Sequence, residues 1–220
     1  MNPNDCICQL KKFNITRLFY LTYIENINSI INNGILSKNE TVNREIKSTS
    51  FAFETVQERR DSKTIELSNN LKIPLHDLVP LYMTPRTPTL SRLRDKQDKL
   101  AFIVIDAQVI CDEKTAFAFT DGSAAAHHTK SYSSLFKLSE IPWNVVNADR
   151  WTELEDGRRK RNAEFLIYPR IEARYIIKFV VENFSSGKIV RKITSSNSFN
   201  KKIVRNAADY FFPNNDSIPF

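Results

Sequence analysis

The stretch Arg158-Arg-Lys-Arg-Asn-Ala-Glu-Phe-Leu-Ile-Tyr168 decides how this chain is interpreted. Four consecutive cations lead into Glu164, which lies within an apolar run, residues 163–168, that predicts a buried strand. A carboxylate is costly to bury unless a positive or reactive group pairs with it. A buried carboxylate beside a cationic loop suits a reaction that builds positive charge on a substrate whose remainder is anionic. The alternative is a glutamate on an edge strand that points to solvent.

The remaining apolar segments predict an α+β fold, because strands outnumber long helices and no strand–helix–strand rhythm repeats. The expected strands cover residues 18–22, 78–83, 100–106, 163–168 and 175–182. Isoleucines at helical spacing precede Gly34, which stands where a helix C-cap glycine belongs. Further helices are expected at residues 50–60 and 123–138, and a mobile polar loop at residues 61–74. The chain of 220 residues fits a single domain, in which residues 1–16 form a peripheral N-terminal segment.

The composition favours a basic protein that binds nucleic acid. The net charge is +7 and the sequence pI is about 9.3, which also fits an ordinary soluble protein with a basic surface. Three cysteines, Cys6, Cys8 and Cys111, form no even framework, so reduced thiols are expected. No metal site is expected, because no Cys or His pair follows at ligand spacing. The sequence shows neither a secretory signal nor a long apolar run, so we expect no membrane contact, a cytoplasmic location and a monomer.

Several motifs in the same order carry a resemblance to one family. The pieces are Leu18-Phe-Tyr-Leu-Thr-Tyr-Ile-Glu-Asn26, Gly34-Ile-Leu-Ser37, Val56-Gln-Glu-Arg-Arg60, Leu75-His-Asp-Leu-Val-Pro-Leu-Tyr-Met-Thr-Pro-Arg-Thr-Pro88, Phe119-Thr-Asp121, Trp151 and Ala163-Glu-Phe-Leu166. Together they resemble the DarT group of DNA ADP-ribosyltransferase toxins, from about residue 19 to residue 212. The resemblance implies an ADP-ribosyltransferase fold with a split central β-sheet and flanking short helices.

The resemblance also implies a reaction and its catalytic residues. A member of this family transfers ADP-ribose from NAD, its co-substrate, to a thymine or guanine base of single-stranded DNA and releases nicotinamide. Glu164 is the expected catalytic carboxylate, since a fixed negative charge stabilises an oxocarbenium-like transition state. Arg60 is the second expected catalytic residue and also a cofactor-binding residue. A guanidinium keeps its charge at ordinary pH, so clamping a phosphate or polarising the base is easier for Arg60 than accepting a proton. Without the resemblance, Arg60 would be a cation at a helix C-terminus.

Two further sets of residues follow from the resemblance. The expected cofactor-binding residues, besides Arg60, are Tyr20, Leu21, Thr22, Asn26, Ser29 and Gly34. Tyr20 departs from the family pattern, since many members have a histidine there. The expected nucleic-acid-binding residues are Arg86, Arg94, Trp151, Arg158, Arg159, Lys160 and Arg161. For the basic run, bracing the loop that selects the substrate is the alternative to touching phosphates.

The implied activity damages the host's own DNA, so the resemblance implies a toxin whose partner is a macrodomain antitoxin of the DarG type. Two competing functions remain open from the sequence. One is an ADP-ribosyltransferase that acts on RNA or protein, because basic clusters do not choose DNA. The other is a non-catalytic nucleic-acid-binding module of the same fold, which would bind in a salt-sensitive way without releasing nicotinamide. His76-Asp77 is read as structural, because adjacent strand residues point to opposite faces.

Overall fold

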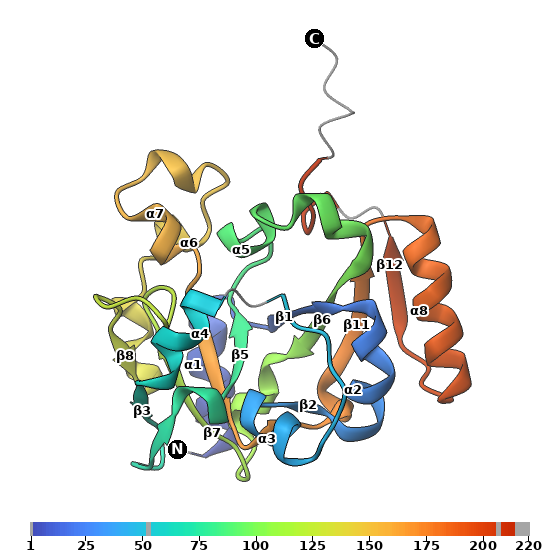
Figure 1. Cartoon of the computed structure of the whole chain (residues 1–220). Helices are drawn as coiled ribbons and strands as arrows, with labels where there is room; N and C mark the ends of the chain where they lie inside the picture. The colour runs from blue at the N-terminus through green and yellow to red at the C-terminus, as the bar shows by residue number, and fades with distance from the viewer. Residues whose placement is uncertain (1, 52–53, 206–207, 214–220) are drawn as a thin grey trace.

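The computed structural model describes residues 2–51, 54–205 and 208–213. Its centre is an eight-stranded sheet in the order β12-β11-β6-β1-β5-β9-β7-β8, antiparallel except between β11 and β12 (Figure 1). Its strands are β1 Arg17–Tyr23, β5 Val79–Tyr82, β6 Leu100–Asp106, β7 Ala116–Thr120, β8 Ser131–Tyr132, β9 Glu164–Tyr168, β11 Ile176–Val181 and β12 Lys202–Arg205. Two small sheets accompany it, formed by β2 Ile35–Leu36 with β10 Arg170–Ile171 and by β3 Thr64–Glu66 with β4 Lys72–Pro74.

Most helices beside the sheet are short, and the two longest are α8 with 13 residues and α1 with 10. The α-helices are α1 Pro3–Lys12, α2 Ile27–Asn33, α3 Lys38–Asn43, α4 Glu54–Asp61, α5 Pro88–Ser91, α6 Trp143–Val146, α7 Gly157–Lys160 and α8 Phe184–Ser196. The 3-10 helices are η1 Ile24–Asn26, η2 Leu75–Asp77, η3 Arg94–Lys99, η4 Ala107–Cys111, η5 Leu135–Glu140, η6 Trp151–Glu153 and η7 Ala173–Tyr175. The predicted α+β class is confirmed, and so are the five expected strands, each within a few residues of its predicted bounds.

The sheet is nearly divided between β1 and β5. Strand β1 pairs with β6 along all seven of its residues, from Arg17 to Tyr23, but it pairs with β5 only where Phe19 faces Tyr82. This thin connection is the split that the family resemblance predicted. On the other side of β5 lies β9, which is paired along both of its edges. Glu164 therefore stands on an interior strand, and the alternative of a solvent-facing edge-strand glutamate is wrong.

The segment after β1 folds as its isoleucine spacing predicts. Ile27 and Ile30 of α2 are buried, and the helix ends at Gly34, whose φ is 80°. A Cβ atom at Gly34 would lie 2.5 Å from the backbone oxygen of Ile171, so the β2–β10 pairing has no room for a side chain there. Glycine tolerates both the positive φ and this close approach. After this turn the chain forms β2 and then α3.

Two expectations for irregular regions are wrong. Residues 61–74 are not a mobile loop, because β3 and β4 form a hairpin whose Ile65 is buried. Residues 123–138 do not form one helix; they form turns, the short strand β8 and the 3-10 helix η5. Of the expected helix over residues 50–60, the structure describes α4, which begins at Glu54 and ends at Asp61, while residues 52 and 53 lie outside the described residues. In the two places where the expectation is wrong, tertiary contacts decide the local structure, and intrinsic propensity does not.

The N-terminal helix α1 covers one side of the main core. Its Cys6 and Leu10 are buried, and Asn2 caps it by accepting a hydrogen bond from the backbone N–H of Asp5. Cys6 forms a disulfide with Cys111 at the end of η4, so the expectation of three reduced thiols is wrong. The two cysteines are 105 positions apart, and no spacing rule connects them in the sequence. Cys8 is a free, exposed thiol.

Candidate active site

A deep cleft opens where the sheet is nearly divided. Its volume is about 880 Å³, which lies within the range of ~300–1,000 Å³ typical of small-molecule sites. Strands β1, β5 and β9 contribute its floor through Tyr20, Tyr82 and Glu164. Helices α2 and α4 and the segment that follows α3 contribute its walls (Figure 1). Most of the lining is apolar or uncharged, so the few charged groups at the floor determine what chemistry the cleft can do.

Glu164 is the carboxylate at the floor of the cleft, and only 5% of its surface is exposed. One carboxylate oxygen, Oε1, accepts a hydrogen bond of 3.1 Å from the backbone N–H of Ala124. The other, Oε2, accepts one of 3.3 Å from Nη1 of Arg60. The backbone N–H of Glu164 donates to Oγ1 of Thr120 at 3.2 Å, which fixes the start of β9 against β7. The carboxylate is therefore held in one orientation from both sides.

Arg60 is the cationic partner of that carboxylate. It lies in the last turn of α4 and is 9% exposed, so the Arg60–Glu164 ion pair is buried. A buried ion pair gains little net stability compared with apolar side chains of similar volume. Its presence at the floor of a cleft therefore indicates a function other than stability. The guanidinium donates only one of its N–H groups to Glu164, and it lines the cleft.

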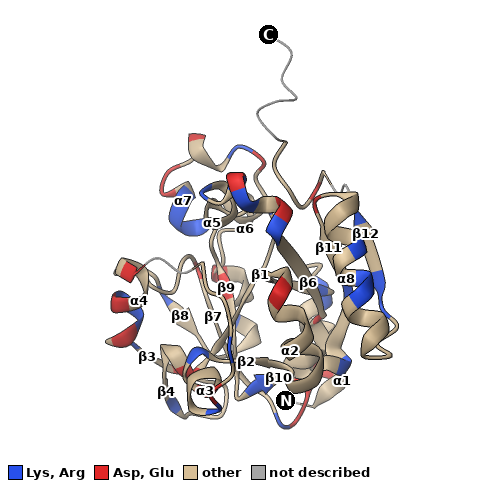
Figure 2. Cartoon of the chain, turned by 45° about the vertical axis from the view of Figure 1, so that its right-hand side comes forward, with Lys and Arg blue, Asp and Glu red and all other residues tan. Residues whose placement is uncertain are grey.

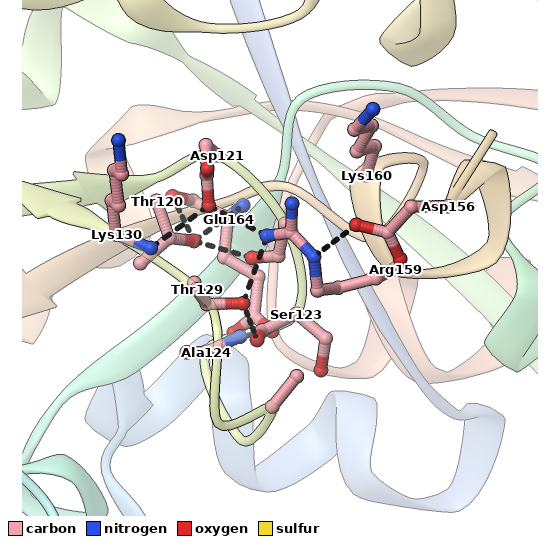
Figure 3. Close-up of polar contacts among 12 residues, drawn as sticks. Thr120, Asp121, Ser123, Ala124, Thr129, Lys130, Asp156, Arg159, Lys160 and Glu164 are labelled. Atoms are coloured by element: carbon pink, nitrogen blue, oxygen red, sulfur yellow. Dashed lines mark hydrogen bonds and ion pairs between the residues drawn. The ribbon is translucent and has the colours of Figure 1, made fainter.

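A loop of residues 121–130 supplies the Ala124 N–H, and basic side chains brace it (Figure 3). Nζ of Lys63 donates to the backbone oxygens of Ala124 at 3.0 Å and Ala126 at 2.6 Å. On the other side, Nη1 of Arg159 donates to Oδ1 of Asp121 at 2.7 Å and to Oγ1 of Thr129 at 3.1 Å. Nε of Arg159 donates to the carboxylate of Asp156 at 2.5 Å. Nothing in the sequence indicated that Lys63 belongs to the site, because it lies in a segment that was expected to be a mobile loop.

The expected cofactor residues Tyr20, Leu21, Thr22, Asn26, Ser29 and Gly34 all line the cleft, together with Arg60 and Glu164. Asn26 has a specific structural role there. Its side-chain amide donates to the backbone oxygen of Thr49 at 2.8 Å and accepts from the backbone N–H of Thr49 at 2.9 Å. It also donates to Oγ1 of Thr22 at 3.1 Å. Asn26 therefore fixes residues 48–51 as a wall of the cleft.

Two tyrosines line the cleft together with the carboxylate of Glu164. Burial raises the pKa of Tyr20 to about 12. Burial, and after it the negative charge of Glu164, raises the pKa of Tyr82 to about 12 as well. Both phenols therefore keep their protons at neutral pH and can donate hydrogen bonds. Tyr82 faces Glu164 directly across the β5–β9 ladder. It belongs to one of the family motifs, but no role was predicted for it.

His76 forms the far wall beside Arg60. Its Nδ1 lies 2.7 Å from Oδ1 of Asp61, while its buried Nε2 has no hydrogen-bond partner among the described residues. Burial, followed by the positive charge of Lys38, lowers the pKa of His76, against the opposing effect of Asp61. The imidazole is therefore neutral at pH 7 and leaves Nε2 free to accept a hydrogen bond. The partner of Asp77 is Asn39, not His76, so the two adjacent residues act separately.

The expected nucleic-acid-binding residues divide into two groups. Arg158 and Arg159 line the cleft, whereas Arg86, Arg94, Trp151, Lys160 and Arg161 do not. Arg86 and Arg94 both lie over the ring of Phe212, at 5.2 and 4.4 Å from its centroid. Lys160 donates to the backbone oxygen of Glu155 at 3.1 Å.

Arg161 is 5% exposed and turns its guanidinium to two backbone oxygens. Nη2 donates to the oxygen of Pro85 at 3.1 Å, and Nη1 donates to that of Val146. Burial lowers the pKa of Arg161 to about 10. These contacts favour the alternative stated for the basic run, in which Arg161 braces the loop before Glu164.

The residues that line the cleft fit a dinucleotide. Lys38, Arg59, Arg60 and Arg158 supply positive charge for phosphates, and His76 offers an unpartnered acceptor. In the described part of the chain, no three His, Cys, Asp or Glu side chains gather as a metal site would require. No described helix is long and apolar enough to span a membrane.

A family model described as "DarT: ssDNA thymidine ADP-ribosyltransferase" matches residues 19–212. A DNA ADP-ribosyl transferase of Thermus sp. strain 2.9 is 29% identical over 192 residues, which cover 81% of this chain and 87% of that protein. A DNA ADP-ribosyl transferase–DNA ADP-ribosyl glycohydrolase fusion protein of Thermosipho africanus is 26% identical over 204 residues. That match covers 90% of this chain and 50% of the fusion.

Solved structures show the same fold. The Thermus sp. 2.9 DarT in complex with ADP-ribosylated ssDNA superposes with a TM-score of 0.79 at 25% identity, covering 89% of this chain and 96% of that one. The same Thermus protein in complex with NAD+ gives a TM-score of 0.73 at 22% identity, over 89% and 98% of the two chains.

Proposed function

The chain belongs to the DarT family of single-stranded DNA ADP-ribosyltransferases, which use NAD, and on that premise we propose how its cleft carries out the transfer. The observation that carries the proposal is the buried Glu164–Arg60 pair at the floor of a cleft lined by every expected cofactor residue. These eight residues come from five elements, β1, η1, α2, α4 and β9, and from the turn at Gly34.

In the proposed reaction, the bond between the ribose C1″ and nicotinamide breaks, and its electron pair leaves with nicotinamide. A nucleophilic atom of the DNA base forms the new bond to C1″, and the base releases one proton. Glu164 stabilises the positive charge that develops on the ribose, because its carboxylate is already fixed by Ala124 and Arg60 and needs no reorganisation. Arg60 holds that carboxylate and uses its remaining N–H groups on a phosphate or on a carbonyl of the base.

We propose thymine or guanine as the acceptor base, and the family description favours thymine. The reacting atoms of a base are hidden in a duplex stack, so an unpaired base is needed. Tyr20, whose phenol stays protonated, takes the place at which many relatives carry histidine and offers a hydrogen bond to the nicotinamide ribose.

We also propose a partner and a location. The Thermosipho africanus relative joins its transferase to a DNA ADP-ribosyl glycohydrolase. A separate macrodomain enzyme of the DarG type that removes the modification is therefore the expected antitoxin of this chain. We place the protein in the cytoplasm, where DNA and NAD meet, and expect a monomer. Thiol trapping in cells would show whether Cys6 and Cys111 are oxidised there, since cytosolic disulfides are rare.

Mass spectrometry of single-stranded oligonucleotides incubated with NAD tests the proposed reaction. The native protein should add one ADP-ribose mass to a single type of base, which fragmentation identifies. Glu164→Gln should slow this transfer by roughly 10²–10³-fold, the order expected for removing one preorganised electrostatic group. Glu66→Gln, the same change at an exposed site on β3, should have no effect. Modification of RNA or protein in place of DNA would keep the fold and overturn the substrate, and no adduct on any polymer would leave a binding module.

A further inference from the structure

Nearly all of the net charge lies at one edge of the sheet, outside the cleft. Residues 176–205, which form β11, α8 and β12, contain seven Lys and Arg and one Glu, whereas the rest of the chain contains 25 Lys and Arg and 24 Asp and Glu. Figure 2 shows the basic residues of α8 and β12 gathered on this edge. The seven cations are Lys178, Lys188, Arg191, Lys192, Lys201, Lys202 and Arg205. None of them lines the cleft.

These cations lack acidic partners within the described part of the chain. Among the described residues, none of the seven forms an ion pair with a carboxylate. Lys188, Arg191 and Lys192 lie three and four positions apart on the exposed side of α8, where like charges destabilise a helix. Lys178 stands opposite Lys202 in the β11–β12 ladder, and like charges directly opposite each other are also unfavourable. The repulsion between these like charges therefore opposes folding, and no ion pair with a carboxylate among the described residues offsets it.

An exposed aromatic ring lies within the same patch. Phe184, the first residue of α8, is 55% exposed. Nζ of Lys188 lies 4.8 Å and the guanidinium carbon of Arg205 lies 4.9 Å from the centroid of its ring. Gly187 makes room for this arrangement, because a Cβ there would come within 2.6 Å of the Arg205 side chain. An exposed ring between two cations suits an unpaired base, which stacks on aromatics while its phosphates meet cations.

The patch adjoins the wall of the cleft. Asn197, the C-cap of α8, donates to the side chain of Asn28 at 2.9 Å and accepts from that of Asn32 at 3.0 Å. Asn28 and Asn32 belong to α2, and Ser29 of the same helix lines the cleft. Helix α8 therefore lies directly beside α2, a wall of the cleft.

We infer that the β11–α8–β12 edge is a second binding surface for single-stranded DNA, which holds the phosphate backbone through Lys188, Arg191 and Lys192 and stacks one base on Phe184. The inference rests on the proposed function, since it takes single-stranded DNA as the substrate. It assigns this surface to a part of the strand distant from the modified base. Short strands that fill only the cleft do not use it.

Fluorescence anisotropy without NAD tests the surface separately from the reaction. The probes are labelled single strands of about 8 and about 30 nucleotides, chosen because single-strand sites typically span ~4–16 nucleotides. The variant K188Q/R191Q/K192Q should bind the long strand roughly ten-fold more weakly. The slope of log K against log salt should fall by about 2, at ~0.7 per phosphate contact. Phe184→Ala should also weaken long-strand binding by roughly ten-fold. Binding of the short strand and its modification in the presence of NAD should stay as in the native protein.

A second triple variant, K12Q/K72Q/K114Q, removes the same charge from exposed lysines on α1, on β4 and after η4. It should bind the long strand almost as the native protein does. Equal weakening by the two triple variants would reduce the effect to overall charge and overturn the inference. Unchanged binding by the α8 variant would overturn it too and would point to an acidic protein as the occupant. Gln is a good helix former and removes repulsion, so the melting temperature of the α8 variant should not fall. A native protein that binds the long strand through this surface but modifies no DNA would refute the proposed function alone.

Discussion

Two basic regions of this protein carry similar charge and use it differently. Residues 158–161 are four consecutive cations in the sequence, yet Arg159 pairs with Asp121 and Asp156, and Arg161 is buried against backbone oxygens. The cations of the β11–α8–β12 edge are scattered over residues 178–205, yet they gather in space and have no carboxylate partners among the described residues. The consecutive cations of residues 158–161 thus serve mainly to hold the active-site loop. The cations that are scattered in the sequence form the surface whose positive charge is not neutralised by ion pairs among the described residues.

The difference shows how charge should be interpreted. Cations that neutralise nearby carboxylates position the atoms around them, and their contribution is local. Cations without partners produce a long-range positive potential, which attracts a polyanion and depends on salt. The pairing of each charge in the folded protein separates these two uses, and that pairing is invisible to a count of Lys and Arg. Substitution of one cation from each group separates the two uses.

The largest effect on stability is expected within the basic run itself. Arg161→Ala should lower the free energy of unfolding by about 2–4 kcal/mol, because it leaves a cavity and removes the donors to the backbone oxygens of Val146 and Pro85. Arg158→Ala, three positions earlier, should change it by less than about 0.5 kcal/mol, because its side chain is exposed. Urea unfolding of both variants provides the measurement. Similar losses for the two variants would show that the run acts as one unit, against the distinction made here.

A smaller effect is expected when a bracing cation beneath Glu164 is removed. Lys63→Met deletes the two hydrogen bonds to the loop oxygens of Ala124 and Ala126, so the Ala124 N–H should hold Glu164 less firmly. We expect kcat to fall by about ten-fold, an effect of about 1.4 kcal/mol on the barrier, while KM for NAD changes little. Single-turnover rates of nicotinamide release measure this.

Two further variants separate positioning by Lys63 from a loss of charge. Lys63→Arg keeps a donor to the loop and should recover part of the rate. Lys130→Met removes a lysine from the same loop, but that side chain is exposed, so its rate should equal the native one. A Lys63→Met enzyme with native kcat would show that the loop holds Ala124 without help from this side chain.

The sequence predicted the strands and the principal carboxylate, because both have local signals. A continuous apolar run such as Leu100–Asp106 has few alternatives to a buried strand, and the structure gives β6 the same bounds. The family motifs placed Glu164 and Arg60 in one site although they are 104 positions apart. Burial and pairing with Arg60 explain why a carboxylate is tolerated within that run.

Features that depend on contacts between distant segments could not be predicted. Lys63 acts on a loop some 60 residues away, and nothing in its own neighbourhood in the sequence indicates this. The pairing of Cys6 with Cys111 is of the same kind. The basic edge was overlooked because its cations lie in separate short groups, residues 188–192 and 201–205 and the single Lys178, with apolar core residues such as Val181 and Val190 between them. Only the parallel β11–β12 pairing and the packing of α8 bring these charges together.

The smallest expected effect is on the pH dependence of stability, and it concerns the protonation of His76 in the cleft. Burial, and after it the positive charges of Lys38 and Arg60, lower the pKa of His76 against the opposing effect of Asp61. In the unfolded chain, His76 should take up a proton near its ordinary pKa of about 6.5. The folded protein takes up the same proton only at lower pH. Between these two pKa values the unfolded state binds more protons, so stability falls as the pH falls through this window.

Replacing His76 by Asn should therefore flatten the dependence of stability on pH below about 6.5, while keeping a donor for Asp61. The difference between the two profiles is limited to about 1.4 kcal/mol per pH unit for one proton. Urea midpoints at pH 5, 6 and 7 measure it. Parallel profiles would mean that the cleft accepts an extra cation as easily as the solvated edge does, where Lys188, Arg191 and Lys192 stand side by side. A flattened profile would show that a further positive charge in the cleft lowers the stability of the fold. At the solvent-exposed edge, by contrast, water and salt screen the neighbouring cations.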